Sequence, residues 1–305
     1  MVQAGSPTSL VRMHPSATAA TPRPDGRFTE IADRTWVARH AWLDVNVTVV
    51  EGDRGLLVVD TLGSESAARA MLDELRAVNG RDVVAVVNTH EHFDHTFGNG
   101  TLLARWPGAV VHAHEAAAAR TVESGRLAKE TYDAEDPHRD EVLATDAVPA
   151  TATFSSVAVV DLGDRVVELV HPGRGHTGGD LVARIPDVDV LLAGDLVEES
   201  APPSYGPDSF PLDWPGALDF VADLLTADTV VVPGHGALVD KGFVAQQRGD
   251  VGLVAEAIFD AASRSVPLEQ AAREGEWPFP ERTVLDALRR GYDQVPRTAR
   301  RLPLV

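Results

Sequence analysis

Short apolar runs alternate with longer amphipathic stretches over most of the chain. Val45 to Val50 and Leu56 to Asp60 flank the turn-like sequence EGDRG, which predicts a β-hairpin. Ser64 to Val78 has apolar residues at helical spacing. Val83 to Val87 is apolar throughout, which is typical of a buried strand. Strand and helix patterns that alternate in this way predict an α/β protein.

A second strand-rich half follows and gives way to helices. The apolar pattern predicts strands at Ala109 to Ala113, Val157 to Val160, Val166 to Val170, Leu181 to Ile185, Val188 to Ala193 and Thr229 to Val232, and helices at Glu115 to Arg120, Pro215 to Leu225, Val251 to Ala262 and Arg282 to Arg290. We therefore divide the chain into a tail (1–26), an α/β domain (27–240) and a helical extension (241–305). The extension packs on the domain, covers its site or forms a homodimer interface.

Two segments carry a weaker pattern. Residues 1–26 are rich in Ala, Pro, Ser and Thr and lack the apolar region of a secretory signal, so we expect a disordered tail and a cytoplasmic protein. Residues 121–150 are acidic and weakly periodic. A connection of that length is usually functional or mobile, so we expect a partly helical segment that acts as a lid.

Composition and charge limit the classes of partner. The 305 residues are 44% hydrophobic, and the formal net charge is −19. Such a charge repels nucleic acid and anionic membrane surfaces, and no run approaches the length of a membrane span. We expect a small molecule as the partner. The chain has no cysteine, so His, Asp and Glu must hold any metal ion.

Ligand chemistry is concentrated in NTHEHFDHTFGN, directly after the strand at 83–87. His90 and His92 are two positions apart, so in an extended chain their imidazoles point to the same side and can grip one ion. Asp94 and His95 follow and suit a second ion nearby. Three more candidates lie after other apolar runs, where loops form sites without disturbing the core, namely His176, Asp195 and His235.

These motifs together resemble the metallo-β-lactamase superfamily. The resemblance covers residues 28–240 and rests on His90-x-His92-x-Asp94-His95, Gly175-His176-Thr177, Gly194-Asp195 and Pro233-Gly234-His235-Gly236, in that order. It implies a four-layer αββα sandwich with a dinuclear site at one edge of its two sheets. The first ion would take His90, His92 and His176, the second would take Asp94, His95 and His235, and Asp195 would bridge the two.

The resemblance also implies an activity. Imidazole and carboxylate ligands without sulfur fit two zinc ions, and also iron or manganese. We expect a hydrolase of a small-molecule ester, thioester, lactone or β-lactam-like bond, with a bridging hydroxide as nucleophile and Asp94 as both ligand and proton shuttle. Glyoxalase II shares this ligand set, but its substrate residues have no match here. The alternative is a mononuclear iron enzyme similar to persulfide dioxygenases.

Other residues near these motifs have supporting or structural interpretations. Asp60 resembles an aspartate of the family's first motif and is expected to support the metal loop through hydrogen bonds. Glu91 lies between two ligands but faces away from them. His112 and His114 form a second HxH pattern without accompanying ligands. Trp42 and the segment 200–214 are expected near the substrate.

Overall fold

The computed structural model describes residues 20–296, so the N-terminal tail is largely outside the described part of the chain. Within that part, the first half forms one mixed sheet of seven strands in chain order. Its first four strands pair antiparallel, and its last four, from β4 on, pair parallel. The strands are β1 (Thr29–Ala32), β2 (Thr35–Arg39), β3 (Asn46–Gly52), β4 (Gly55–Val59), β5 (Val83–Val87), β6 (Val110–His114) and β7 (Ala152–Phe154).

The second half forms a sheet of five strands in the order β12-β11-β10-β9-β8. All neighbours are antiparallel except β11 and β12, which run parallel and bring their carboxyl ends to the same edge. The strands are β8 (Val157–Asp161), β9 (Val166–Val170), β10 (Val182–Ile185), β11 (Val190–Glu198) and β12 (Val230–His235).

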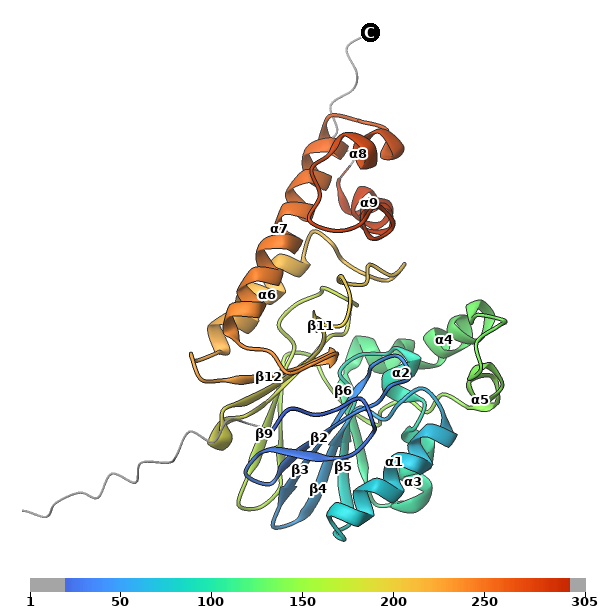
Figure 1. The fold of residues 1–305 in the computed structure, drawn as a ribbon, viewed down its shortest axis with the longest axis vertical. Helices are drawn as coiled ribbons and strands as arrows, with labels where there is room; N and C mark the ends of the chain where they lie inside the picture. Colours follow the sequence, from blue (N-terminus) through green and yellow to red (C-terminus); the bar gives the residue numbers. More distant parts are fainter. Residues whose placement is uncertain (1–19, 297–305) are drawn as a thin grey trace, which may run out of the picture.

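The two sheets face each other, and helices cover their outer faces (Figure 1). Leu57 and Val87 of the first sheet pack against Leu169 and Leu192 of the second in an apolar layer between the sheets. Strands buried on both faces need apolar residues at successive positions, which explains the uninterrupted runs in β4 and β5. The arrangement is the expected four-layer αββα sandwich.

Helices from each half bury one stripe against their own sheet. Met71 and Leu75 of α1 (Glu65–Val78) pack with Leu102 of α3 (Asn99–Arg105) on the first sheet. The second sheet is covered by α6 (Trp214–Leu224) and α7 (Lys241–Ser263), followed by α8 (Leu268–Glu274) and α9 (Glu281–Gln294), which rise above the sandwich in Figure 1. Within residues 20–296, no helix is long and apolar enough to cross a membrane.

The segment at 121–150 is more ordered than its composition suggests. Helix α4 (Glu115–Thr131) continues well past the expected Arg120, and α5 (Arg139–Ala144) follows it. Both protrude beside the sheet edge in Figure 1. The helix continues because one face of α4, including Ala117, Thr121 and Ser124, is buried even though its residues are small or polar. The partly helical prediction holds for this segment.

At Gly98, within NTHEHFDHTFGN, a close contact excludes any side chain larger than that of glycine. A Cβ atom on Gly98 would lie 2.0 Å from the carbonyl oxygen of Thr61. We predict that Gly98→Ala lowers the free energy of unfolding by about 1–3 kcal/mol, because the backbone must shift to admit the methyl group. Urea denaturation measures this change.

The matched control is Gly216→Ala in α6, where an added Cβ would meet no atom within 4 Å. Alanine favours the helical backbone there, so stability should be unchanged or slightly higher. Equal stability of wild type and Gly98→Ala would contradict the packing described for this loop.

His40 gives the fold a pH dependence of its own. Burial lowers the pKa of His40 to about 4, so the folded chain holds this imidazole neutral. The unfolded chain binds a proton near pH 6.5, and stability is therefore lost as the pH falls through the window from 6.5 to 4. His40→Gln removes the titrating group. When the pH falls from 7 to 5, the free energy of unfolding of the variant should therefore decrease by roughly 2 kcal/mol less than that of wild type.

Urea unfolding at both pH values tests this prediction. Parallel pH profiles of the two proteins would show that His40 does not titrate as described.

Candidate metal centre

The first group of candidate ligands lies where β5 leaves the first sheet. His90 is buried just after the strand, and His92 has an extended backbone (φ −68°, ψ 151°) at the start of α2 (Phe93–Thr96). The short helix then carries Asp94 and His95. The change from strand to helix places Asp94 and His95 beside the first two imidazoles, with the ring centroids of His90 and His95 4.4 Å apart. His90 and His92, two positions apart, therefore belong to one cluster, and the adjacent Asp94 and His95 belong to a neighbouring one.

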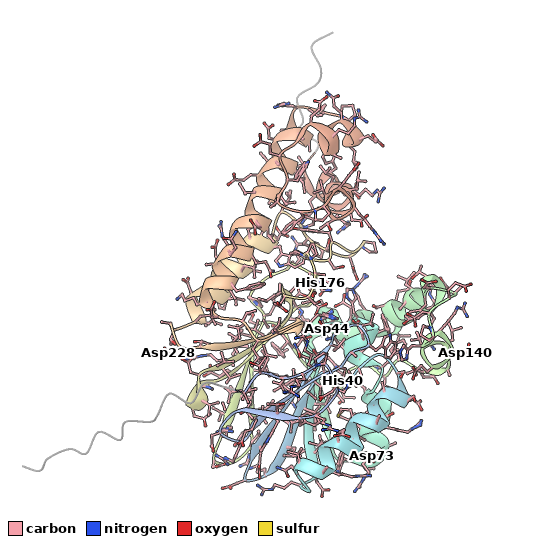
Figure 2. All side chains as sticks on the ribbon, in the orientation of Figure 1. His40, Asp44, Asp73, Asp140, His176 and Asp228 are labelled. Atoms are coloured by element: carbon pink, nitrogen blue, oxygen red, sulfur yellow. The ribbon has the colours of Figure 1, made fainter. Side chains whose placement is uncertain are left out.

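The other candidates come from the second sheet. His176 lies in the loop after β9, Asp195 in β11 and His235 at the end of β12. Figure 2 shows His176 in the centre of the molecule, between the sandwich and the C-terminal helices. A glycine lets β12 approach Asp195 closely, since a Cβ atom on Gly234 would lie 1.9 Å from Oδ1 of Asp195. Glycine before His235 therefore keeps room for the carboxylate.

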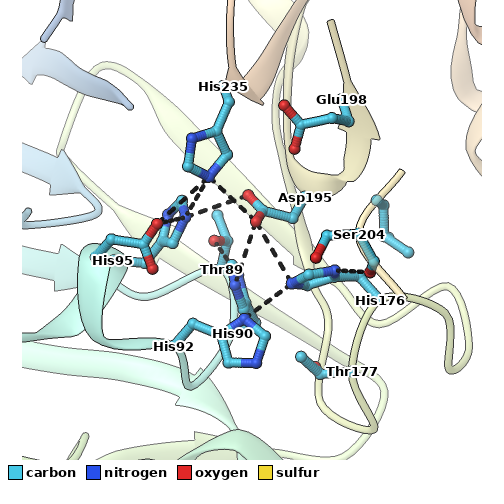
Figure 3. Close-up of polar contacts among 12 residues, drawn as sticks. Thr89, His90, His92, His95, His176, Thr177, Asp195, Glu198, Ser204 and His235 are labelled. Carbon is cyan, nitrogen blue, oxygen red and sulfur yellow. Dashed lines mark hydrogen bonds and ion pairs between the residues drawn. The ribbon is translucent and has the colours of Figure 1, made fainter. Parts of the chain in front are cut away.

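Two clusters of candidate ligands share the Asp195 carboxylate between them (Figure 3). Oδ2 of Asp195 lies 3.7 Å from Nε2 of His90, 3.4 Å from Nε2 of His176 and 3.2 Å from Nε2 of His235. Oδ1 lies 3.2 Å from Nε2 of His95. One cluster consists of His90, His92, His176 and Asp195, and the other of Asp94, His95 and His235. A third group, Asp195, Glu198 and His235, overlaps both.

The structure thus brings together all seven residues that the sequence singled out. Oδ2 of Asp94 completes the second cluster at 3.7 Å from Nε2 of His95 and 3.5 Å from Nε2 of His235. In the first cluster, Nδ1 of His92 lies 2.9 Å from Nε2 of His176.

The remaining nitrogen of each imidazole is held by an outer oxygen, which fixes the orientation of the ring. Such partners are usual around metal-binding histidines. The pairs are His90 Nδ1 with Thr89 Oγ1 (3.0 Å), His92 Nε2 with Asp208 Oδ2 (3.1 Å), His95 Nδ1 with Asp60 Oδ2 (2.8 Å), His176 Nδ1 with the Ser204 carbonyl (3.1 Å) and His235 Nδ1 with the Leu43 carbonyl (2.6 Å).

Asp60 has the supporting position expected of it. It is buried at the end of β4 with a left-handed backbone (φ 63°). Its carboxylate accepts hydrogen bonds from the backbone N–H and the hydroxyl of Thr89, at 2.8 Å each, and also contacts Nδ1 of His95. One side chain therefore connects the loop that begins the first cluster to a ligand of the second.

The electrostatics of the centre favour a cation. Burial would raise the pKa of Asp195, but the four surrounding imidazoles hold it well below its ordinary value, so the carboxylate is ionised. Burial, together with the neighbouring imidazoles, lowers the pKa of His90 well below its ordinary value. Burial likewise lowers the pKa of His176 to about 4. Burial would also lower the pKa of His92 and of His235, but the carboxylates of Asp208 and Asp195 raise them to about 9 and about 10. These two imidazoles therefore release a proton when they bind zinc or a related metal.

An unpartnered atom tests whether these donors fit a metal ion. Nε2 of His90 is buried and, among residues 20–296, has no hydrogen-bond partner. A buried polar atom without a partner is costly, because it has lost its contact with water. The nitrogen faces the Asp195 carboxylate, where a metal ion would satisfy it. The donors present therefore fit a metal ion held by His90, His92, His176 and Asp195.

A cavity of about 640 Å³ opens over the centre. Its floor includes His92, Asp94, His176, Asp195 and His235. Its walls are mainly apolar and come from three places: Leu43 beside β3, Leu127 and Ala128 on α4, and Pro202 and Pro207 in the 199–213 loop. Helix α4 and the 199–213 loop therefore do lie beside the site, as expected for the 121–150 and 200–214 segments.

Several other residues have structural partners. Glu91 is buried and its Oε1 accepts a hydrogen bond from Nε of Arg120 at 3.0 Å, in agreement with its expected exclusion from the ligands. Nδ1 of His114 accepts a bond from the backbone N–H of Ala116 at the start of α4. Trp42 stacks on His138 with ring centroids 4.2 Å apart.

No sequence pattern marks Asp208 or Glu198 as residues of the site. Asp208 lies in the Pro-rich 200–214 segment, whose position was expected, but no pattern marks this aspartate among its neighbours. Glu198 ends β11 three residues after Asp195, lines the cavity and accepts a hydrogen bond from Ser200 at 2.8 Å. Burial raises the pKa of Glu198 to about 8. A residue three positions after Asp195 is expected on the opposite face of a regular strand, so this spacing carried no signal for Glu198. Strand β11 is irregular between Gly194 and Glu198.

Comparisons with known proteins agree with the fold. The family model of the metallo-beta-lactamase superfamily matches residues 40–235. The chain is 27% identical to a metallo-beta-lactamase type 2 of Bacillus cereus over 202 aligned residues. The alignment covers 65% of this chain and 70% of that protein. The chain belongs to the metallo-β-lactamase superfamily.

Two solved structures share its fold. The stereoselective inverting sec-alkylsulfatase Pisa1 from Pseudomonas sp. superposes with a TM-score of 0.69 at 18% identity, over 88% of this chain and 50% of that one. The metallo-beta-lactamase FIM-1 from Pseudomonas aeruginosa, in its mono-zinc form, gives a TM-score of 0.58 at 19% identity, over 75% of this chain and 95% of that one.

The Asp60 contact yields a prediction about metal affinity. Asp60→Asn removes the carboxylate that faces Nδ1 of His95, whereas asparagine tolerates the left-handed backbone at this position. We expect the affinity of the second cluster for zinc to fall about 10–100-fold, since partners of metal-binding histidines contribute on that scale. Competition with a chromophoric chelator measures the change.

Asp73→Asn on α1, whose side chain is exposed, is the matched control and should bind zinc as wild type does. Wild-type zinc affinity in Asp60→Asn would show that this aspartate does not support the centre.

Proposed function

We propose that this protein is a dinuclear metal-dependent hydrolase of a small molecule with an ester, thioester, lactone or β-lactam-like bond. The observation that carries the proposal is the place of Asp195, whose two oxygens face histidines of both clusters. Its ligands would be His90, His92 and His176 for one ion and Asp94, His95 and His235 for the other. Zinc is the expected metal, and iron or manganese would also fit these imidazole and carboxylate donors.

Two divalent cations held there would supply a nucleophile at neutral pH and stabilise the negative charge that develops on the substrate. The protein's own residues set the geometry. Asp195 holds the clusters together, and Asp60 fixes the His95 ring in one orientation. The side chain of Asp94 lines the cavity as well as the second cluster, so its carboxylate can accept a proton from the attacking group and pass it to the leaving group.

The cavity supports a small substrate with an apolar part. Leu43, Phe93, Leu127 and Pro202 line it beside the candidate ligands, and a volume of about 640 Å³ is within the range of pockets for small ligands. The bond to be cleaved would lie over Asp195, and the apolar part of the substrate would contact these walls.

Metal content tests the proposal first. Elemental analysis of wild type should find about two zinc ions per chain. Asp195→Ala should lose metal from both clusters, because its carboxylate faces both. The control Asp223→Ala changes an exposed aspartate on α6 and should keep the wild-type content. A single iron per wild-type chain would instead favour the dioxygenase alternative, and the absence of metal from a folded wild type would contradict the proposal.

Hydrolysis tests it second. Wild type should cleave at least one member of a panel of uncharged thioesters, lactones and β-lactams, and a chelator should abolish that activity. Asp94→Asn keeps the shape of the side chain but removes the proton acceptor and a charged donor of the second cluster. Measured at saturating zinc, kcat should fall roughly 10²–10⁴-fold. Activity that survives both the chelator and the substitution would contradict the proposed mechanism.

A further inference from the structure

The loop at residues 199–213, between β11 and α6, orients two imidazoles of the first cluster. The Ser204 carbonyl lies 3.1 Å from Nδ1 of His176. The Asp208 carboxylate lies 3.1 Å from Nε2 of His92. The opposite nitrogens of these two rings face each other at 2.9 Å, on the side where a metal ion would bind. The position of the loop therefore sets the direction of both donors.

The second cluster takes its orientation from other parts of the chain. His95 is held by Asp60 at the end of β4. His235 is held by the carbonyl of Leu43, next to β3. A displacement of the 199–213 loop would therefore change the outer partners of the first cluster and leave those of the second in place.

Helix α9 of the C-terminal extension holds the same loop from its far side. Nε of Arg290 donates a hydrogen bond to the carbonyl of Ser209, a fully buried residue, at 2.9 Å. Oε1 of Gln294 accepts a hydrogen bond from the backbone N–H of Leu212 at 3.0 Å. Both bonds reach the main chain of the loop, so they restrain its path.

The restrained stretch is also bonded to the backbone beside His176. The N–H of Phe210 donates to the carbonyl of Gly175 at 2.8 Å. The guanidinium of Arg290 lies 5.5 Å from the centroid of the Phe210 ring, within cation–π range. Two successive contacts therefore connect α9 to the residue that precedes a candidate ligand.

Helix α9 is itself fixed on the sandwich. Val284 and Leu288 are buried in the same apolar cluster as α6 and α7. Gly291 packs so closely on α7 that a Cβ there would lie 2.5 Å from Cγ2 of Ile258. Arg290 and Gln294 thus project from a helix whose position is set by the core of the extension.

We propose that Arg290 and Gln294 are positioning residues for the first cluster. Through the 199–213 loop they hold His92 and His176 in the geometry that binds metal, so the C-terminal extension contributes to the affinity of one of the two sites. This proposal rests on the proposed function in one respect, since it requires that the clusters bind metal ions.

The test is a zinc titration of the full chain, freed of metal, in competition with a chromophoric chelator. Wild type should show two binding steps. In Arg290→Ala/Gln294→Ala, one step should weaken roughly tenfold, because loss of outer partners costs about 10–100-fold in metal affinity. The other step should be unchanged. Arg289→Ala on the same helix removes only an exposed ion pair with Asp286 and should match wild type.

Two further variants assign the steps. Asp208→Asn should weaken the same step as the double variant. Asp60→Asn should weaken mainly the other step, because its carboxylate contacts His95 directly and reaches His90 only through Thr89. The single variant Arg290→Lys should bind zinc at the first cluster's step with nearly wild-type affinity, because lysine keeps a cationic donor for the Ser209 carbonyl. If the double variant does not fold, Gln294→Ala alone should show a smaller loss confined to the same step.

Two outcomes would overturn the proposal while leaving the hydrolase assignment intact. One is wild-type affinity at both steps in the double variant. The other is an equal loss at both steps that follows a lower melting temperature, as expected of a role in stability alone. A wild type that binds no zinc would overturn both the positioning role and the proposed function.

Discussion

The Asp195 carboxylate is buried among imidazoles from four separate segments of the chain, and the rest of the site is arranged around it. A buried carboxylate is unfavourable unless positive charge or hydrogen bonds compensate for its lost hydration. Here the compensating groups come from the loop after β5, α2, the loop after β9 and the end of β12. Both sheets must therefore pack in register before this charge is stabilised, which couples the integrity of the sandwich to the geometry of the site.

The centre is made rigid by a second set of contacts that extends far beyond the ligands. Asp60 at the end of β4 and the Leu43 carbonyl orient one cluster, while Asp208 and the Ser204 carbonyl orient the other. The first pair belongs to the N-terminal sheet and the second to a loop of the C-terminal half. The two clusters thus share the Asp195 carboxylate and, through Thr89, the support of Asp60, but only the first cluster has partners in the 199–213 loop. That division gives the helical extension a route to one cluster alone.

Much of this could be predicted from the sequence, and the reason is local. The residues after β5 combine a strand end, a two-residue histidine spacing and a helix start, so His90, His92, Asp94 and His95 are placed by short-range geometry. Hydrophobic periodicity likewise predicted most strands of the two sheets and α1. The family resemblance then implied that these residues share a site with His176, Asp195 and His235, and the structure places all seven side by side.

Long-range contacts were beyond local patterns. Asp208 reaches His92 across 116 positions, and nothing in the Pro-rich loop distinguishes it from other aspartates. The full length of α4 was underestimated because its buried face is made of small and polar residues. The contacts of Arg290 and Gln294 with the loop depend on how α9 packs on α7, which no pattern in the extension reveals.

Anomalous diffraction at the zinc edge, from crystals of wild type grown with zinc, tests the central claim most directly. The account predicts two peaks about 3.5–4 Å apart with the Asp195 carboxylate between them. One peak should lie among His90, His92 and His176, and the other among Asp94, His95 and His235. A single peak away from Asp195, or peaks outside these clusters, would contradict it.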